Sequence, residues 1–214
     1  MLNIAVLASG RGTNLAAIIA AIARGELAAR VAVVVSDRRS AGALSQAAAH
    51  GIPTAVLRPR DYPDRAAHDR AIAELLAGHG VELICLAGYM RLFGSEFIRR
   101  HYGRLINIHP ALLPAFPGLD VQQAALDYGV KVAGCTVHFV DEGVDTGPII
   151  LQRAVPVHED DTVETLTARI LAAEHLAYPE AIGLFAAGRL RLEGRRVRVL
   201  APGAGEINDN PEEA

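Results

Sequence analysis

The first half of the chain alternates short apolar runs with Ala-rich segments, and this alternation constrains the fold more than any other feature of the sequence. The apolar runs are typical of strands buried on both faces of a sheet, and they span residues 4–8, 31–35, 54–57, 83–87 and 105–108. The segments between them are typical of helices, and they cover residues 15–23, 41–50, 64–76 and 95–102. This order predicts a mostly parallel central sheet with helices on both faces.

The pattern changes after Pro110, where a loop containing Pro and Gly interrupts the alternation. Two strand-like runs follow at residues 132–140 and 149–157, and the polar stretch between them predicts an antiparallel hairpin. The remaining expected elements are a helix over 121–128 capped by Asp120, a helix from a capping box at 161–164 to residue 187, and a small hairpin over 190–200. The two halves together predict an α/β, Rossmann-like fold with an antiparallel hairpin in the C-terminal half.

The length of 214 residues suits one domain, and no linker divides the chain. We expect a single domain over residues 1–200 and a flexible tail over residues 201–214, where Gly, Pro and acidic residues gather. A net charge of −3 gives no electrostatic reason to expect nucleic acid or an anionic membrane as partner. No signal-peptide pattern and no apolar run of membrane-spanning length is present, so we expect a cytoplasmic enzyme.

Residues that bind metals or form covalent intermediates do not occur in recognisable patterns. Cys85 and Cys135 both lie in apolar runs and are expected to be small buried side chains. No Cys-x-x-Cys or His-Glu-x-x-His spacing occurs, so no metal site is predicted. Lys131 is the only lysine, and nothing around it favours Schiff-base chemistry.

Two polar residues, Asn107 and His109, alternate with apolar residues just before Pro110. Side chains two apart on a strand share a face, so this pair should point one way while Ile106 and Ile108 point the other. Because Pro110 ends the strand, the pair lies at a carboxyl end, where open α/β sheets bind ligands. An amide and an imidazole can stabilise an oxyanion and move a proton, which predicts acyl-group chemistry.

A glycine-containing loop at residues 9–14 falls between the first expected strand and the first expected helix. Exposed backbone N–H groups and the helix N-terminus favour a phosphate group there. The loop begins like a dinucleotide-binding pattern, with Asp37 in place of the ribose-binding acid, but Leu15 stands where the third glycine belongs. A phosphomonoester site with Thr13 and Asn14 as further donors fits better than a dinucleotide site or a simple tight turn.

A second loop, at residues 87–93, also follows an expected central strand. Its Met, Leu, Phe and Arg side chains suit a flat aromatic ligand that carries a carboxylate or a polar ring edge. Packing of Met90 and Phe93 into the core accounts for the pattern equally well. These residues alone leave both interpretations open.

The loop at residues 141–148 holds three acids, which normally indicates exposure to solvent. Asp145 lies between two glycines, however, so the chain can approach a ligand closely there. A carboxylate near His109 would favour the imidazolium and accept a proton, directly or through water. His138, on the preceding expected strand, shares a face with Thr136 and is interpreted as a supporting residue.

Five segments together closely resemble the phosphoribosylglycinamide (GAR) formyltransferases of purine biosynthesis. The matching segments are residues 8–14, 86–91, 107–114, 136–140 and 145–150. Each motif is modest alone, but five in this order and at the family's spacing are highly specific. The resemblance covers roughly residues 1–190.

The resemblance implies that a formyl group passes from the co-substrate 10-formyltetrahydrofolate to the amine of GAR. It implies that Asn107 and His109 stabilise the oxyanion and that Asp145 handles the proton leaving the amine. The implied GAR-binding residues are Gly12, Thr13, Asn14 and Glu174. The implied folate-binding residues are Arg65, Met90, Arg91, Leu92, Phe93, Asn107, Asp141, Glu142, Gly143 and Val144. The expected partners are these two small molecules, bound by a monomer or a homodimer.

Two residues depart from the family's pattern, because Ala111 stands where many members have Ser and Asp120 where they often have His. A role carried by that histidine is therefore not implied for this chain. Formyltetrahydrofolate hydrolase shares the Asn-His-Asp group but usually has an N-terminal regulatory domain, and methionyl-tRNA formyltransferase has a C-terminal domain for tRNA. Neither extra domain is expected, because the chain starts at its first strand and its tail is short and not basic. A non-catalytic nucleotide-binding module is the remaining alternative, and its binding would survive the loss of Asn107 or Asp145.

Overall fold

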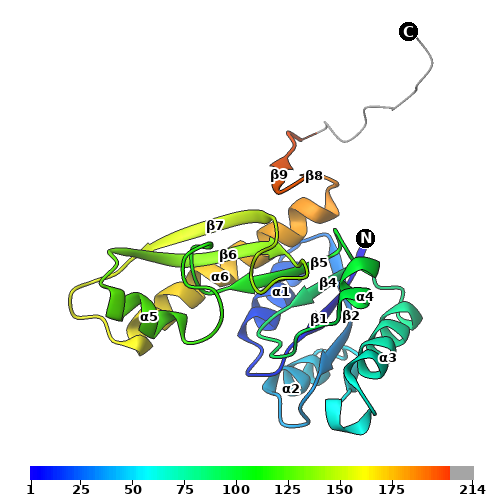
Figure 1. The fold of residues 1–214 in the computed structure, drawn as a ribbon. Coiled ribbons are helices and arrows are strands. Elements are labelled where there is room, and N and C mark those ends of the chain that lie inside the picture. The colour runs from blue at the N-terminus through cyan, green and yellow to red at the C-terminus, as the bar shows by residue number, and fades with distance from the viewer. Residues whose placement is uncertain (203–214) are drawn as a thin grey trace, which may run out of the picture.

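A central seven-stranded sheet organises the structure, a computed structural model that describes residues 1–202 (Figure 1). The expected flexible tail lies outside the described residues from residue 203 onward. The strands are β1 Leu2–Leu7, β2 Ala29–Ser36, β3 Thr54–Val56, β4 Leu83–Leu86, β5 Leu105–His109, β6 Val132–Phe139 and β7 Ile149–Pro156.

The order across the sheet is β3-β2-β1-β4-β5-β6-β7. Neighbours from β3 to β5 pair in parallel, whereas β6 runs antiparallel to both β5 and β7. The predicted α/β fold, with a mostly parallel sheet and an antiparallel hairpin in the C-terminal half, is confirmed.

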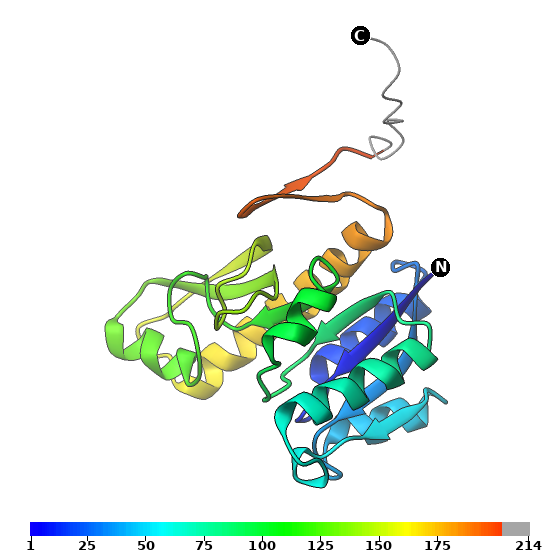
Figure 2. The ribbon, with the colours of Figure 1, turned by 45° about the vertical axis from the view of Figure 1, so that its right-hand side comes forward.

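Helices cover both faces of this sheet, as the sequence predicts. They are α1 Thr13–Ala23, α2 Gly42–Ala49, α3 Arg65–Gly78, α4 Ser95–Arg100, α5 Val121–Tyr128 and α6 Val163–Ala186, with a short 3₁₀ turn at Pro59–Asp61. One buried cluster joins the sheet to α1, α2, α5 and α6, and a second joins it to α3 and α4. Figure 2 shows α3 on the near side of the sheet and α1 and α6 behind it. None of the described helices is long and apolar enough to span a membrane.

Side chains of β5 divide between the two faces as the alternation predicts. Ile106 and Ile108 pack in the cluster with α1 and α6, whereas Leu105 packs in the cluster with α3 and α4. Asn107 and His109 follow the alternation of Leu105 and therefore share its face of the sheet.

Two of the expected helix caps were wrong. Asp120 occupies the cap position of α5 but has a left-handed backbone, with φ of 53°, and its side chain makes no capping hydrogen bond. At α6 the capping box consists of Thr162 and Thr165, whose hydroxyls accept from each other's backbone N–H, and not of Asp161 and Glu164. Both errors arise because a cap depends on backbone dihedrals that residue type does not determine.

The last described elements form the small antiparallel hairpin expected over residues 190–200. Its strands are β8 Leu190–Glu193 and β9 Arg196–Val199, and the hairpin lies beyond the C-terminal end of α6 (Figure 1). Arg195, at its turn, donates a hydrogen bond of 2.9 Å to the carbonyl of Thr146. The hairpin therefore contacts the loop between β6 and β7.

The buried hydroxyl of Tyr178 connects α6 to the two central strands β4 and β5. Tyr178 is fully buried, and its hydroxyl lies 2.7 Å from the carbonyl of Leu86 in β4 and 3.3 Å from that of Ile106 in β5. Glu174 lies one turn earlier on the same face of α6, so this bond also sets where Glu174 meets the sheet.

We predict that Tyr178→Phe lowers the free energy of unfolding by about 1–2 kcal/mol, because it leaves buried carbonyls without this donor. Urea denaturation measures the change, and Tyr128→Phe, at a side chain that is 81% exposed, is the control. Equal stability of the Tyr178→Phe variant and the wild type would show that the hydroxyl does not hold α6.

Candidate active site

The two loops singled out in the sequence lie next to each other at the carboxyl edge of the sheet. They follow β1 and β4, the adjacent central strands between which the strand order reverses, and such a point is where open α/β sheets bind ligands. The N–H of Ser9 donates to the carbonyl of Gly88 at 3.0 Å, and the N–H of Met90 donates to the hydroxyl of Ser9 at 2.9 Å. Two hydrogen bonds thus join the loop after β1 to the loop after β4, close to the ends of these strands.

Asn107 is held by the neighbouring antiparallel strand. It lies directly opposite His138 of β6, and its Nδ2 is 3.3 Å from His138 Nε2. The other ring nitrogen of His138 donates to the carbonyl of Phe139 at 2.8 Å, so Nε2 is the acceptor for the Asn107 amide. This bond uses one of the two amide N–H groups of Asn107 and leaves the other free.

His138 is suited to this role because it stays neutral. Burial lowers the pKa of His138 below its ordinary value, although the Phe139 carbonyl and the Asp145 carboxylate act in the opposite direction. A protonated ring would present a donor to the Asn107 amide and lose this hydrogen bond. The predicted supporting role of His138 therefore has a physical basis in the structure.

His109 faces an acceptor at each of its ring nitrogens. Nε2 donates to the carbonyl of Phe116 at 2.8 Å, and Nδ1 lies 3.4 Å from Oδ2 of Asp145. A carbonyl can only accept, so Nε2 carries a hydrogen, whereas the contact between Nδ1 and Oδ2 is longer than a normal hydrogen bond. The ring is 4% exposed, and the pairing with Asp145 therefore acts with little screening by solvent.

Asp145 lies in the loop between β6 and β7, which folds back over this face of the sheet. Its Oδ2 accepts from the N–H of Gly118 at 2.9 Å, and its Oδ1 is 3.7 Å from His138 Nε2. The approach expected from the flanking glycines occurs at Gly147, where any Cβ would collide with the carbonyl of Phe139. Close passage of the loop over β6 is what brings the Asp145 carboxylate to His109.

The glycine loop ends at Gly12, which has a left-handed φ of 82° and forms the N-cap of α1. A Cβ at this position would lie 2.7 Å from the Cα of Ala43 in α2. The glycine is therefore required by the packing of α1 against α2 as well as by the turn. Thr13 opens α1 and Asn14 follows it, so both lie at the helix N-terminus, where an anion is favoured.

Glu174 and Asn14 form a buried pair beside this loop. The Asn14 amide donates to Glu174 at 2.8 Å, and the two residues are 8% (Asn14) and 6% (Glu174) exposed. Burial raises the pKa of the Glu174 carboxyl, and the hydrogen bond from Asn14 opposes this only in part. Asn14 Oδ1 is buried and has no hydrogen-bond partner in the part of the chain that the structure describes.

Two clefts meet at the edge of the sheet. The larger, of about 650 Å³, runs from the glycine loop to α6, and the smaller, of about 240 Å³, extends toward α3 and α4. The residues that line both are Tyr89, Arg91, Leu92, Asn107, Val144 and Asp145. Asn107 and Asp145 therefore stand where ligands in the two clefts would touch.

The clefts separate the two sets of binding residues implied by the resemblance. The larger cleft collects Gly12, Thr13, Asn14 and Glu174, together with His109. The smaller cleft collects Arg65, Arg91, Leu92, Phe93, Asn107, Asp141, Glu142, Gly143 and Val144. Met90 is the exception, because it lines the larger cleft instead.

The sequence left two interpretations of the 87–93 loop open, ligand binding and core packing, and the structure places Phe93 in the core and Met90 at the cleft. Phe93 is 7% exposed and stacks on Phe97 with ring centroids 4.1 Å apart, so it packs in the core. Met90 is 52% exposed at the cleft and is not a core residue.

Asp37 is part of the site in a way that the sequence did not reveal. Its side chain is fully buried and accepts from Arg91 Nε at 2.8 Å. Burial acts to raise the pKa of Asp37, but the Ser9 hydroxyl and the Arg91 guanidinium outweigh it and lower that pKa. Asp37 thus has a role apart from the ribose-binding one that Leu15 already made unfavourable, because its Oδ2 is paired with Arg91. The position of Asp37 directly after β2 was the only signal in the sequence.

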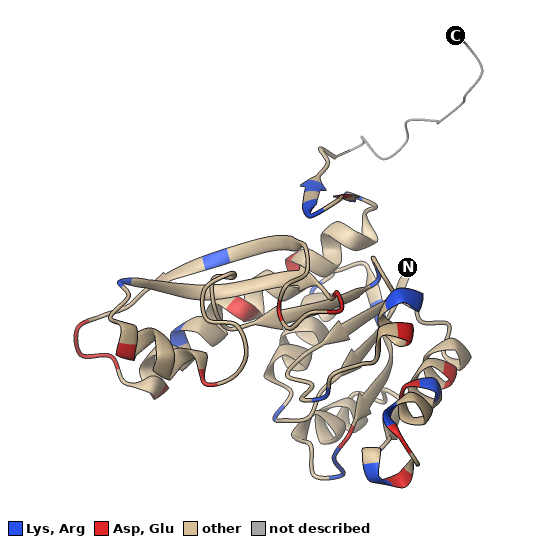
Figure 3. Cartoon of the chain, in the orientation of Figure 1, with Lys and Arg blue, Asp and Glu red and all other residues tan. Residues whose placement is uncertain are grey.

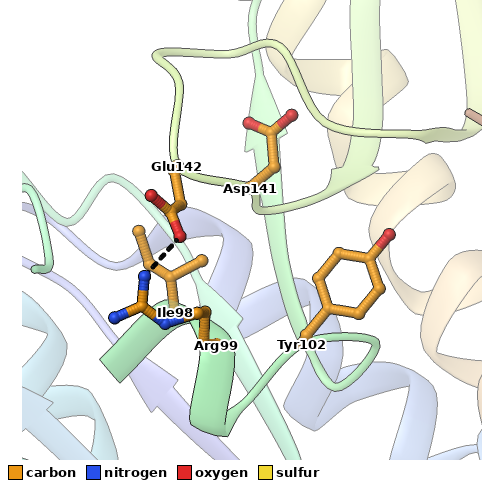
Figure 4. A pocket seen from close by; sticks show the side chains of 5 residues that line it. All are labelled: Ile98, Arg99, Tyr102, Asp141 and Glu142. Carbon is orange, nitrogen blue, oxygen red and sulfur yellow. Dashed lines mark hydrogen bonds and ion pairs between the residues drawn. The ribbon is translucent and has the colours of Figure 1, made fainter. Parts of the chain in front are cut away.

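Figure 4 shows a pocket between the loop after β6 and α4. Arg99 of α4 donates to Glu142 at 3.1 Å, and Tyr102 and Asp141 line the same pocket. Asp141 accepts from the hydroxyl of Thr146 at 2.6 Å, within the loop itself. The loop that carries Asp145 is thus tied both internally and to α4.

No cluster of three or more metal-binding side chains occurs within residues 1–202.

Most of the chain is similar to proteins of known name. The family model described as Formyl transferase matches residues 2–182. The phosphoribosylglycinamide formyltransferase of Bacillus subtilis (strain 168) is 48% identical over 182 residues, which are 85% of this chain and 93% of that protein. The crystal structure of glycinamide ribonucleotide transformylase 1 from Symbiobacterium toebii matches with a TM-score of 0.92 and 58% identity, over 94% of this chain and 95% of that chain.

Longer proteins match as well. The trifunctional purine biosynthetic protein adenosine-3 of Drosophila pseudoobscura pseudoobscura is 51% identical over 192 residues, which are 88% of this chain. This chain spans 14% of the length of that protein, so what the whole of that protein does is not carried over to it.

Glu174 gives a test of the electrostatics of the site. Its raised pKa means that the folded protein holds this proton more tightly than the unfolded chain does, so the contribution to stability is present at low pH and is lost as pH rises through the folded-state pKa. We predict that Glu174→Gln is more stable than the wild type near pH 8 and that this advantage shrinks as pH falls toward about 4.3, the ordinary pKa of Glu.

Urea denaturation over this pH range measures the difference, and Glu74→Gln, on the exposed face of α3, is the control. A difference between Glu174→Gln and the wild type that stays constant with pH would contradict the cost assigned to the buried carboxylate.

Proposed function

Because the chain belongs to the formyl transferase family, we propose that it transfers the formyl group of 10-formyltetrahydrofolate to the amine of GAR, giving formyl-GAR and tetrahydrofolate. The observation that carries this proposal is the meeting of two clefts at Asn107 and Asp145. A bimolecular transfer needs two ligands whose reacting atoms meet beside groups that handle charge and protons. The names and coverage of the similar proteins support GAR as the acceptor.

In the proposed reaction, the amine nitrogen of GAR bonds to the formyl carbon, and the bond from that carbon to N10 of the folate breaks. The carbonyl oxygen carries negative charge in between, and Asn107 offers it the amide N–H that His138 leaves free. His109 offers the N–H at Nδ1, because its 3.4 Å separation from Asp145 is longer than a normal hydrogen bond. Two preformed donors then face the developing charge.

Asp145 is the proposed acceptor for the proton that the attacking amine loses. That proton ends on N10 of the departing tetrahydrofolate, so the overall transfer is balanced without an added acid or base. The bond from Gly118 N–H holds the carboxylate in this orientation, beside His109, before the reaction begins. The division of roles is oxyanion stabilisation by Asn107 and His109 and proton transfer by Asp145.

Binding of GAR is assigned to the larger cleft. The N-terminus of α1 at Gly12, Thr13 and Asn14 would receive the phosphate, and Glu174 would contact the sugar or the amine. The buried Glu174 carboxylate is only partly compensated by Asn14, so a hydroxyl or an ammonium group would improve its environment.

The folate is assigned to the smaller cleft, where its flat ring would lie between Leu92 and the loop after β6, which carries Val144. Phe93 supports this cleft from the core, and Met90 borders it from the GAR side. The guanidinium of Arg91 is bonded to Asp37, so Arg91 acts mainly by fixing the backbone of its loop. Arg65 is left as the cation for the carboxylates of the folate.

Further properties belong to the same proposal. We propose one catalytic domain over residues 1–200, a cytoplasmic location, no metal, and no nucleic-acid or membrane partner. We also propose a monomer or a homodimer as the active form.

The direct test mixes the purified protein with GAR and 10-formyltetrahydrofolate and follows release of tetrahydrofolate. We expect release only when GAR is present, because the amine is the acceptor. Release without GAR would favour formyltetrahydrofolate hydrolase instead. Asn107→Ala tests the remaining alternative, a non-catalytic nucleotide-binding module. Such a module would bind GAR, but neither the wild type nor the variant would turn it over. We expect turnover in the wild type and a rate that is roughly 10²–10³-fold lower in Asn107→Ala.

Asp145→Asn tests the assignment of the proton. We predict a rate loss of roughly 10²–10⁴-fold with GAR binding retained, because the amide cannot accept this proton. Asn tolerates the left-handed backbone at this position, where φ is 53°, and its carbonyl can still accept from Gly118. Steady-state kinetics measure the loss, and exposed Asp160→Asn is the control. Near-normal turnover in Asp145→Asn would rule out Asp145 as the proton acceptor.

A further inference from the structure

The C-terminal hairpin of β8 and β9 lies beyond the segment that the family model matches, which ends at residue 182. It is nevertheless packed onto the domain, since Leu190, Leu192 and Val197 contact a buried cluster and β9 lies against β7. Two hydrogen bonds close its open end, from the N–H of Leu200 to the carbonyl of Arg189 at 2.8 Å and from Arg189 Nε to the carbonyl of Leu200 at 2.7 Å. The hairpin is therefore a packed part of the domain.

The turn of this hairpin reaches the loop between β6 and β7. It consists of Gly194 and Arg195, and the positive φ of 59° at Gly194 suits a tight two-residue turn. Figure 3 shows basic segments on the hairpin, and two of its arginines pair with Glu193 inside the hairpin itself. Arg195 differs from these two, because its Nη1 donates to the carbonyl of Thr146 at 2.9 Å.

The bond to Thr146 falls directly after Asp145, whose backbone is left-handed, with φ of 53°. A residue other than glycine keeps this conformation only where the surrounding structure fixes it. The hydroxyl of Thr146 donates to Asp141 within the loop, whereas Arg195 bonds to the carbonyl of Thr146 from outside the loop. Arg195 thereby restrains the backbone next to the proposed proton acceptor.

The loop between β6 and β7 serves both the proposed proton transfer and the folate cleft. Gly143, Val144 and Asp145 line the smaller cleft, and the Asp145 carboxylate lies 3.4 Å from His109 Nδ1. The phosphate of GAR is assigned to a different segment, the N-terminus of α1. A small displacement of the loop would therefore disturb proton transfer and folate binding and leave the phosphate contacts in place.

We propose that Arg195 is a positioning residue for formyl transfer, because its hydrogen bond to the Thr146 carbonyl holds the loop that carries Asp145. Arg195 itself lines neither the larger nor the smaller cleft. This inference rests on the proposed function, because it takes the roles of Asp145 and of the folate cleft as given. It makes the C-terminal hairpin, which lies beyond the family model's match, part of the support of the active site.

Arg195→Ala tests the proposal by steady-state kinetics of the full chain. We expect kcat/KM for 10-formyltetrahydrofolate to fall roughly 3- to 10-fold, the range that one hydrogen bond supplies when water can replace it. KM for GAR should stay at the wild-type value, because the phosphate contacts remain. Arg195→Lys keeps a charged donor and should recover most of the loss.

Arg196→Ala is the matched control, since Arg196 is the next residue, is exposed, and lines neither cleft. It removes the same charge from the same hairpin and should keep wild-type kinetics. Wild-type kinetics in Arg195→Ala would overturn the proposal. So would an equal loss in Arg196→Ala, because the effect would then be one of charge in general. An equal rise of KM for GAR in Arg195→Ala would also overturn it, because the effect would then not be confined to the loop.

Amide hydrogen exchange separates failure of this inference from failure of the proposed function, because it needs no turnover. If the wild type transfers no formyl group to GAR, the proposed function fails, and exchange over residues 141–148 decides the role of Arg195. Faster exchange of this loop in Arg195→Ala than in the wild type and in Arg196→Ala supports the bond as a local restraint. Equal exchange in all three proteins, or faster exchange throughout the chain in Arg195→Ala, overturns it.

Discussion

The antiparallel pairing of β6 with β5 is the constraint on which the candidate site depends. The connection from β5 to β6 contains α5 and turns the chain back along β5 in the opposite direction. The antiparallel register sets His138 directly opposite Asn107, and the following loop folds back over the same face. Asp145 thereby reaches His109 from a position 36 residues later in the chain. The change from parallel to antiparallel pairing thus assembles the three polar groups.

The groups at this junction are held by partners that cannot change their hydrogen-bonding role. The carbonyls of Phe116 and Phe139 can only accept, so they determine which ring nitrogens of His109 and His138 carry protons. His138 then accepts from the Asn107 amide and orients it, while the Asp145 carboxylate lies 3.4 Å from His109 Nδ1. Donors and charges are in place before any substrate enters, which is the form of electrostatic stabilisation that costs no reorganisation during reaction.

Local patterns in the sequence predicted the parts of this site that depend on one element. Period-two alternation gave the common face of Asn107 and His109, and the βαβα order gave the sheet edge where they lie. The bond between Asp37 and Arg91 could not be predicted from the sequence. The two residues are 54 positions apart, and no motif around either one indicates the other as its partner. The cap assigned to Asp120 failed for a related reason, since its left-handed backbone is set by the loop that enters α5 and not by residue type.

The bond between Asp37 and Arg91 also connects the loops that line the two clefts. Ser9 belongs to the loop assigned to the phosphate. Its hydroxyl accepts from the N–H of Met90, and it also lowers the pKa of the Asp37 carboxyl. Asp37 in turn accepts from Arg91, so one polar network around the buried Asp37 side chain connects both loops. A displacement of either loop would leave a buried carboxylate without its partners, which is costly. The network therefore links the loop at the N-terminus of α1 to the loop that carries Leu92, and it resists displacement of one loop relative to the other.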